Sequence, residues 1–370
     1  MTNDATHGAA AESRQDQFSG TKEVADSHRF DEAKLHAYML DHVEGYEGPL
    51  TVQQFKGGQS NPTYQLITPK RKYVLRRKPP GKLLPSAHAV DREYKVITAL
   101  HNVGFAAPRT FCLCEDDSVI GTAFYIMDMV VGRVLWEPLL PGQDPATRWK
   151  IYESLNATMA HLHNIDHVKA GLEDFGKPGN YFARQVSRWS KQYVASETQT
   201  ITEMNKLMEW LPDNIPADDT VSVVHGDYRL DNTVLHPTEP KVIAVLDWEL
   251  STLGHPIGDF TYSCMQWVMP GQGTGGGTGS IATADLKSLG IPTLEQYIEM
   301  YCKSTNRSGI DNLDFYFAYN FFRLAGILQG IAGRVRDGTA SSEHAKAMSE
   351  NVRPLAEEAW KYALRAGAGS

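Results

Sequence analysis

The apolar positions divide the chain into a strand-rich part and a helix-rich part. Between residues 50 and 131 they form short runs of strand length, separated by turns rich in Gly, Pro and Asp. Residues 30–43 and 87–100 instead carry apolar side chains at helical spacing. Later in the chain, the same spacing predicts helices over residues 146–165, 181–200, 201–211, 292–303, 313–336 and 342–366. The pattern therefore predicts a small strand-rich unit followed by a larger helical one.

Three short apolar runs interrupt the helical part and bring polar residues together. Residues 221–224 form a mostly β-branched run that suits a buried strand, and a polar loop with Asp227 follows it. Two further runs, separated by turn formers, predict an antiparallel hairpin over residues 233–246. Asn232 starts its first strand and Asp247 ends its second, so we expect both at one end of the hairpin. Three oxygen-bearing side chains at one loop edge suit Mg²⁺, which prefers oxygen ligands.

The spacing of these polar residues matches a known arrangement. His225-x-Asp227, an Asn five residues after the Asp, and an Asp after a hairpin form the catalytic-loop and metal-loop layout of protein-kinase-like phosphotransferases. A lone His-x-Asp would be explained equally well as a chance polar loop between core strands. The full set, H-G-D-x-x-x-x-N followed by I-A-V-L-D-W-E, resembles the aminoglycoside phosphotransferase and choline kinase-like superfamily.

The resemblance covers residues 30–366 and implies an α+β, two-lobed protein-kinase-like fold. We expect a small β-rich N-lobe over residues 28–129 and a larger, mainly helical C-lobe over 130–370. Residues 1–27 are polar and poor in aromatics, which predicts a disordered tail. In the superfamily, the hinge between the lobes meets the adenine of the nucleotide, and the resemblance places that backbone at Asp128, Met129 and Val130.

A glycine-containing loop between two predicted strands is the candidate phosphate-binding loop. Glycine has no Cβ, so backbone N–H groups can approach phosphate oxygens closely. The loop reads G-G-Q-S-N-P-T and resembles the G-x-S-N-x-T loop of the superfamily. Its candidate nucleotide-binding residues are Gly57, Gly58, Ser60 and Asn61. Taken alone, the loop is better explained as a Gly-Gly hairpin turn, and its context favours the phosphate-binding role.

Arg76 lies on a predicted strand, residues 72–77, whose alternation puts Val74 on the same face. If that face looks into a cleft, Arg76 holds the place of the lysine that binds phosphates in protein kinases. An arginine there stays charged and can hold an anion with two nitrogens. Glu93, on the predicted helix over residues 87–100, is the candidate partner of Arg76. The alternatives are a surface arginine on an edge strand and a solvated helix charge.

The resemblance also implies a division of chemical work. Asn232 and Asp247 would hold one or two Mg²⁺ ions, which bridge phosphate oxygens of ATP or GTP. Asp227 would accept or orient the hydroxyl proton of the acceptor, and Arg229 would help to neutralise the transferring phosphoryl group. Asp259 would hydrogen-bond the backbone of the catalytic loop or start a helix. Positioning and charge neutralisation, rather than covalent chemistry, would carry the rate.

A longer run from Tyr73 to Tyr94 is similar to a narrower branch, the kinase-like domain fused to or encoded near acyl-CoA dehydrogenases. That branch suggests a hydroxyacyl-CoA or a similar metabolite as the small-molecule hydroxyl acceptor. No dehydrogenase domain follows, so we expect a stand-alone form.

Two alternatives to the phosphotransferase function stay open. One is a catalytically inactive nucleotide-binding or scaffold protein, because position 76 holds Arg in place of Lys. The other, ranked last, is a metal-dependent hydrolase.

Composition excludes several classes of function. The net charge is −8 and no long basic block is present, which argues against a nucleic-acid partner. The sequence has no stretch of about 18 apolar residues and no signal pattern, so we expect neither a membrane span nor a membrane partner. Four cysteines predict free thiols in a cytoplasmic protein. The sequence does not fix the oligomeric state, and a homodimer is one of the alternatives. The Gly-rich segment 271–280 predicts a flexible loop, either a lid or a surface excursion.

Overall fold

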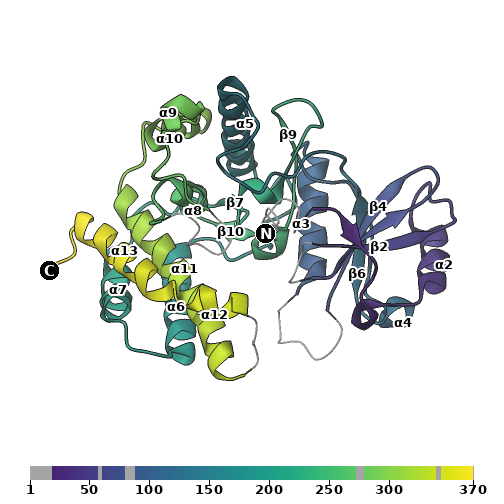
Figure 1. Ribbon diagram of the computed structural model, residues 1–370, viewed down its shortest axis with the longest axis horizontal. Coiled ribbons are helices and arrows are strands. Elements are labelled where there is room, and N and C mark those ends of the chain that lie inside the picture. Colours follow the sequence, from purple (N-terminus) through teal and green to yellow (C-terminus); the bar gives the residue numbers. More distant parts are fainter. Residues whose placement is uncertain (1–18, 57–60, 80–87, 272–278, 339–342, 370) are drawn as a thin grey trace, which may run out of the picture.

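The computed structural model describes residues 19–56, 61–79, 88–271, 279–338 and 343–369. Its two lobes lie side by side, with the sheet on the right of Figure 1 and most of the helices on the left. Among the described residues, the small lobe holds one antiparallel sheet in the strand order β1-β2-β3-β4-β6-β5. Its strands are β1 (Thr21–Lys22), β2 (Thr51–Phe55), β3 (Thr63–Ile67), β4 (Lys72–Arg77), β5 (Thr110–Cys114) and β6 (Phe124–Asp128).

Side-chain alternation along β4 divides the small lobe into two packed faces. Tyr73 and Leu75 are buried in a cluster that also contains side chains of α2 (Glu32–His42). Val74 points the other way and belongs to the larger core, together with residues of α3 (Val90–Asn102). The short helix α4 (Asp117–Ile120) lies in the connection between β5 and β6. The predicted alternation therefore places Arg76 on the α3 side of the sheet.

The predicted tail is too long. Residues 1–18 lie outside the described residues, but Thr21 and Lys22 form β1 and pair antiparallel with Phe55 and Gln54 of β2. A 3-10 turn, η1 (Asp26–His28), follows. Composition alone suggested disorder here because two residues of strand carry too little apolar pattern to be recognised.

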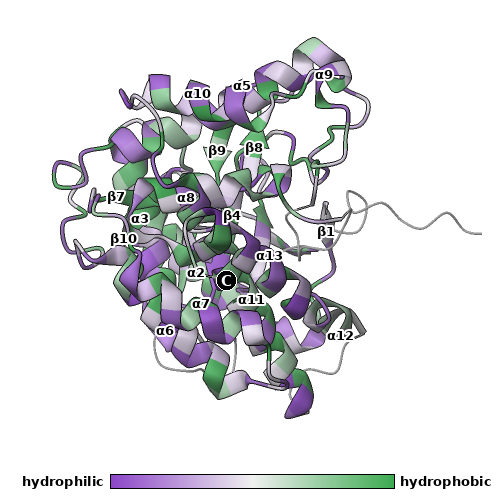
Figure 2. Ribbon diagram, turned by 90° about the vertical axis from the view of Figure 1, so that its left-hand side faces the viewer, coloured by the Kyte–Doolittle hydropathy of each residue, from purple (hydrophilic) through white to green (hydrophobic). Residues whose placement is uncertain are grey.

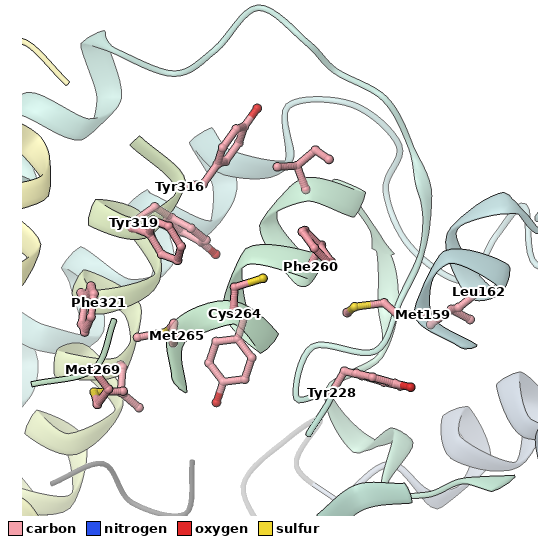
Figure 3. Close-up of a cluster of buried hydrophobic side chains, with 14 of the residues drawn as sticks. Met159, Leu162, Tyr228, Phe260, Cys264, Met265, Met269, Tyr316, Tyr319 and Phe321 are labelled. Carbon is pink, nitrogen blue, oxygen red and sulfur yellow. The ribbon is translucent and has the colours of Figure 1, made fainter. Parts of the chain in front are cut away.

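The large lobe is mainly helical, as predicted. Its helices are α5 (Pro145–Asn164), α6 (Tyr181–Ser196), α7 (Thr202–Asp213), α8 (Pro256–Ser263), α9 (Leu286–Leu289), α10 (Leu294–Ser304), α11 (Leu313–Arg336), α12 (Glu343–Ser349) and α13 (Val352–Arg365). The last predicted helix, 342–366, is therefore two helices. Figure 3 shows the core between α5 and α11, where Met159, Phe260 and Tyr319 lie among the buried side chains. Figure 2 shows purple and green residues on the same helices, as expected for helices with one buried face.

Two small antiparallel pairs carry the polar loops of the large lobe. β7 (Ser222–Val224) pairs with β10 (Thr252–Gly254), and β8 (Thr233–Leu235) pairs with β9 (Val242–Val245). The second pair is the hairpin that the sequence predicted. The 3-10 turns η2 (Leu230–Asn232) and η3 (Trp248–Leu250) lie directly before β8 and soon after β9. A third such turn, η4 (Cys264–Trp267), follows α8.

Two further predictions can be compared with the described residues. All four cysteines are buried and free. No helix within the described ranges is both long enough and apolar enough to span a membrane. Most of the predicted Gly-rich loop, residues 272–278, lies outside the described residues.

Candidate active site

A cavity of about 610 Å³ lies between the sheet and the large lobe. Its size is in the range of small-molecule and cofactor sites. Residues from both lobes line it, and they include seven of the residues singled out from the sequence: Val74, Arg76, Asp128, Met129, Val130, Asn232 and Asp247. Ser19, Gly20 and Thr21, which the sequence assigned to the tail, line it as well.

Arg76 is the centre of a charge cluster on the small-lobe side of the cavity. Its Nε lies 2.8 Å from Glu93 Oε2, which makes the ion pair that the sequence predicted. Its Nη2 lies 2.7 Å from Asp247 Oδ1 and 3.2 Å from Glu249 Oε2. The cluster thus joins β4, α3 and the turn after β9. The alternatives of a surface arginine and a solvated helix charge are wrong, because Arg76 and Glu93 are both buried.

Glu93 is held by two neutral donors in addition to Arg76. Asn61 Nδ2 donates to Oε1 at 2.8 Å, and Tyr125 Oη donates to Oε2 at 3.1 Å. Burial raises the pKa of Glu93, and the Arg76 charge acts against that rise. Burial would lower the pKa of Arg76, but the charges of Asp247 and Glu93 outweigh it and raise that pKa. One cation faces three carboxylates, so the cluster carries an excess of two negative charges when all are ionised.

Of the four candidate nucleotide-binding residues in the predicted phosphate loop, Asn61 lies within the described residues. Gly57, Gly58 and Ser60 lie outside the described residues. Asn61 is fully buried, and its Oδ1 lies 2.8 Å from His88 Nδ1 while its Nδ2 donates to Glu93. The end of that loop is therefore bonded to the residue that pairs with Arg76.

The catalytic loop is held by buried hydrogen bonds to its backbone. Asp259, at the start of α8, accepts from His225 N at 2.7 Å and from Gly226 N at 2.8 Å, as the sequence predicted. Burial opposes the Asp259 charge, but His163 and His225 outweigh it and lower the pKa of Asp259. His225 Nε2 donates to Leu246 O at 2.8 Å, which ties the loop to the end of β9. His225 therefore braces the loop.

Asp227 is surrounded by donors. Asn232 Nδ2 donates to its backbone oxygen at 2.9 Å and to its Oδ2 at 3.2 Å. Tyr262 Oη donates to its Oδ1 at 2.9 Å, and Arg229 Nε lies 3.6 Å from the same oxygen. Arg229 also pairs with Asp231 at 2.8 Å. Burial works against the Arg229 charge, but Asp227 and Asp231 raise its pKa.

Sequence reasoning missed three members of this site. Tyr262 and Arg323 contact the catalytic loop, and Tyr125 contacts Glu93. They lie on α8, α11 and β6, where aromatic and long side chains are ordinary core residues. Tyr262 carried a weak signal, because it follows Asp259 by three residues and shares its helix face. Arg323 carried none beyond a charge within an otherwise apolar helix.

Asp247 has a left-handed backbone conformation that residues other than glycine rarely adopt, with φ 64° and ψ 64°. Such left-handed residues other than glycine cluster at functional sites, because the surrounding structure must hold them there. Asp247 ends the hairpin, and its neighbour Leu246 donates N–H to Asn232 O at 2.8 Å. The two predicted metal ligands are therefore fixed at one end of the hairpin.

Comparison with known proteins agrees with this geometry. A family model described as the phosphotransferase enzyme family matches residues 51–302, more than half of the chain. The chain belongs to this family. The matched region of this family member contains both the Arg76 cluster and the catalytic loop.

Curated relatives of this phosphotransferase-family chain carry the kinase-like domain within longer proteins. The chain is 43% identical over 345 residues to acyl-CoA dehydrogenase family member 11 of Homo sapiens, which covers 92% of the chain and 44% of that protein. It is 45% identical over 320 residues to family member 10 of Mus musculus, covering 86% of the chain and 30% of that protein. The chain thus spans less than half of these relatives.

Solved structures confirm the predicted kinase-like fold. A Ralstonia eutropha protein assigned to the aminoglycoside phosphotransferases has 52% identity and a TM-score of 0.83, covering 91% of this chain and 99% of that one. A thermostable mutant of aminoglycoside phosphotransferase APH(4)-Ia, in complex with AMP-PNP and hygromycin B, has 12% identity and a TM-score of 0.59. It covers 91% of this chain and 100% of that one, and its likeness shows the fold alone.

Proposed function

We propose that this chain moves the γ-phosphoryl group of ATP or GTP to a hydroxyl group of a small molecule, with Mg²⁺ as cofactor. The observation that carries the proposal is the Arg76 cluster at the interlobe cavity, in which one arginine faces Glu93, Asp247 and Glu249. A partly buried excess of negative charge beside a cavity of about 610 Å³ favours a divalent cation there. Family membership and the kinase-like fold support the same reaction class.

The residues present fit Mg²⁺. Asp247 offers a carboxylate, and the Asn232 amide is oriented by its two donations to Asp227, which leaves its carbonyl oxygen as the acceptor for a cation. Within the described residues, no three His, Cys, Asp or Glu side chains gather as a metal site. Mg²⁺ commonly takes one or two protein ligands and completes its shell with water and substrate phosphates. Bound there, the metal would neutralise charge on the phosphate oxygens.

The remaining residues divide the work of positioning. Arg76, held by Glu93, neutralises phosphate charge from the small-lobe side. Asp227 orients the acceptor hydroxyl and receives its proton, and Arg229, 3.6 Å from it, offsets charge on the transferring group. The backbone of residues 128–130 lines the cavity where the base of the nucleotide would sit. The APH(4)-Ia structure was solved with AMP-PNP, which supports a nucleotide as the co-substrate here.

The proposed acceptor is a hydroxyacyl-CoA or a related hydroxylated metabolite. This proposal is supported by the relatives named acyl-CoA dehydrogenase family members, whose kinase-like portion this chain matches. An enzyme that phosphorylates a hydroxyacyl group would make that hydroxyl a better leaving group. The cationic aminoglycoside acceptors of the fold relatives are the alternative acceptor class.

Acceptor-dependent nucleotide consumption tests the proposal. The protein is incubated with ATP or GTP and Mg²⁺ against a panel of 3- and 4-hydroxyacyl-CoA, choline, homoserine, sugars and an aminoglycoside, and the phosphorylated product is identified by mass spectrometry. We expect turnover with hydroxyacyl-CoA that stops when Mg²⁺ is chelated. Nucleotide binding without turnover on any acceptor would favour the inactive scaffold. Phosphate release from esters without nucleotide would favour the hydrolase.

A further inference from the structure

Two buried side chains connect the core of the large lobe to the catalytic loop. Tyr262 Oη donates to Asp227 Oδ1 at 2.9 Å. Arg323 Nη2 donates to the backbone oxygen of Gly226 at 2.6 Å, and its guanidinium carbon lies 4.8 Å from the centre of the Tyr262 ring. Both side chains are only 6% exposed. The catalytic aspartate therefore receives one contact directly and one through the residue before it.

The two helices that carry these side chains are locked to each other and to the loop. On α8, Asp259 holds the loop N–H groups, and Tyr262 follows three residues later on the same face. On α11, Asn320 Nδ2 donates to Gly258 O at 3.1 Å and to Thr261 Oγ1 at 3.0 Å. Arg323 lies three residues after Asn320, so the contact between the helices sets where its guanidinium lies. The loop thus rests on a rigid support.

Gly226 makes the Arg323 contact specific. Its φ is +84°, and a Cβ at this position would lie 2.8 Å from Leu250 O. Only glycine fits such a conformation at this distance. The carbonyl of Gly226 therefore points in one direction, and Arg323 Nη2 meets it there. Both backbone polar groups of Gly226, the residue before Asp227, are therefore held: the N–H by Asp259 and the carbonyl by Arg323.

Burying the Arg323 charge is costly, and its surroundings show what offsets the cost. Burial opposes its charge, but its pKa is raised by its neighbours, which are the phenols of Tyr319, Tyr181 and Tyr262 and the carboxylate of Asp227. Because the phenols stay protonated, the Asp227 carboxylate is the member of this set that offsets the charge. Within the described residues, it forms no ion pair. Burial and the Asp227 charge raise the pKa of Tyr262, so its phenol stays protonated and can donate to Asp227. Arg323 thus keeps a buried charge despite its desolvation cost, and its Nη2 donates to the backbone of the catalytic loop.

We infer that Tyr262 and Arg323 are positioning residues for phosphoryl transfer, which fix the Asp227 carboxylate and its loop from α8 and α11. The inference rests on the proposed function for its effect on turnover, but not for its effect on the loop. A 1 Å displacement of a reacting group can cost about 10²-fold in rate, which is why such support would matter.

The small lobe contains a matched pair that provides controls. Tyr64 and Arg77 are also buried, at 0% and 2% exposure, and Arg77 lies 5.6 Å from the Tyr64 ring. Tyr64 Oη donates to His28 O, and Arg77 donates to Ile120 O and His28 O. Their chemistry resembles that of Tyr262 and Arg323, but they contact no residue of the catalytic loop.

The test compares Tyr262→Phe and Arg323→Met with Tyr64→Phe and Arg77→Met in the full chain. We expect kcat to fall about tenfold in Tyr262→Phe and further in Arg323→Met, with KM for the Mg-nucleotide unchanged. Arg323→Lys should recover part of kcat, because it restores the charge and one donor. Tyr64→Phe and Arg77→Met should keep wild-type kcat. Wild-type kcat in Tyr262→Phe and Arg323→Met, or equal losses in both pairs, would overturn the inference.

Amide hydrogen exchange over residues 225–232 separates this inference from the proposed function. We expect faster exchange there in Arg323→Met than in Arg77→Met. If the wild type turns over no nucleotide, the proposed function fails, while the exchange result still decides the loop contact. If Arg323→Met does not fold, Tyr262→Phe, which keeps the ring, decides the matter. Unchanged exchange together with unchanged kcat in Tyr262→Phe would leave both side chains as ordinary core residues.

Discussion

The nucleotide side of the cavity and the catalytic loop are held together by different kinds of contact. On the nucleotide side, Arg76 bridges Glu93, Asp247 and Glu249 through side-chain ion pairs at 2.7–3.2 Å. In the loop, side chains hold Asp227 and also bind backbone groups, as Asp259 does at two N–H groups and Arg323 at one carbonyl. Ion pairs between side chains can be exchanged for a metal and phosphates, whereas backbone groups stay where they are.

This difference suggests that the loop is ready before substrate arrives and that the Arg76 cluster rearranges when substrate binds. Preorganised groups cost no reorganisation at the moment of reaction. The cluster carries excess negative charge, so it should disfavour a free nucleotide and favour one bound to Mg²⁺. If the two regions are independent in this way, a change in one should leave the measured property of the other untouched.

The largest effect is expected for Asp227→Asn. The substitution keeps the shape of the side chain but removes the base, and losing a general base costs about 10²–10⁴-fold in rate. Turnover should therefore fall by at least about 10²-fold, while Mg-nucleotide affinity, measured by calorimetry, stays at the wild-type value. Unchanged turnover would remove the base assignment. A parallel loss of nucleotide affinity would show that the two regions are coupled.

Asp247→Ala should have the next largest effect, on binding. It removes the carboxylate ligand, and metal coordination contributes several kcal/mol, so affinity for the Mg-nucleotide should fall at least about 100-fold. Without its carboxylate ligand, the metal should no longer strengthen binding, and the free nucleotide should meet less negative charge. The residual binding should therefore be the same with Mg²⁺ and with a chelator. In the wild type, a chelator should abolish binding. Equal Mg-nucleotide affinity in variant and wild type would refute the metal role.

The elements of the fold that could be predicted from the sequence are those with a pattern of apolar residues or turn formers within one short segment. The helix over 313–336 was predicted with its observed bounds, because apolar side chains recur at helical spacing along the whole segment and no proline interrupts it. The hairpin that joins Asn232 to Asp247 was predicted because turn formers separate two short β-branched runs. The break between α12 and α13 was missed, because helical spacing continues across it.

Contacts between distant segments explain what could not be predicted. Tyr262 and Arg323 are 61 residues apart in number, and neither has a local pattern that points to Asp227. The strand β1 was missed because two residues acquire strand geometry only by pairing with β2. The Arg76–Glu93 pair could be proposed only through a family resemblance. Such a resemblance implies contacts between distant segments, whereas the spacing of residues along one chain does not.

Asp259→Asn should lower the free energy of unfolding by about 1.5–3 kcal/mol, the value of a hydrogen bond to a charged group. The pKa of Asp259 is lower in the folded protein than in the unfolded chain. Its stabilising contribution is therefore complete above about pH 4, the unfolded value, and is lost as pH falls through the folded pKa. Thermal unfolding between pH 2 and 7 should show the wild-type advantage shrinking toward acid. Asp144→Asn, at an exposed helix cap that Asn also serves, is the control.

Glu93→Gln is the smallest expected change and the sharpest test of independence. Glutamine can still accept from one of the two donors, Tyr125 or Asn61, through its single carboxamide oxygen. It also removes one charge from Arg76, which keeps Asp247 and Glu249 as partners. We expect Mg-nucleotide affinity and turnover each to fall by roughly tenfold, about the value of one charge-assisted contact. Glu44→Gln, which breaks the exposed pair with Arg109, should change neither.

Hydrogen exchange in residues 225–232 of Glu93→Gln should match the wild type, because hydrogen bonds from α8 and α11 to the backbone hold that loop. Faster exchange there would mean that the ion pairs of the small lobe also support the catalytic loop, and the two regions would then have to be treated as one cooperative site.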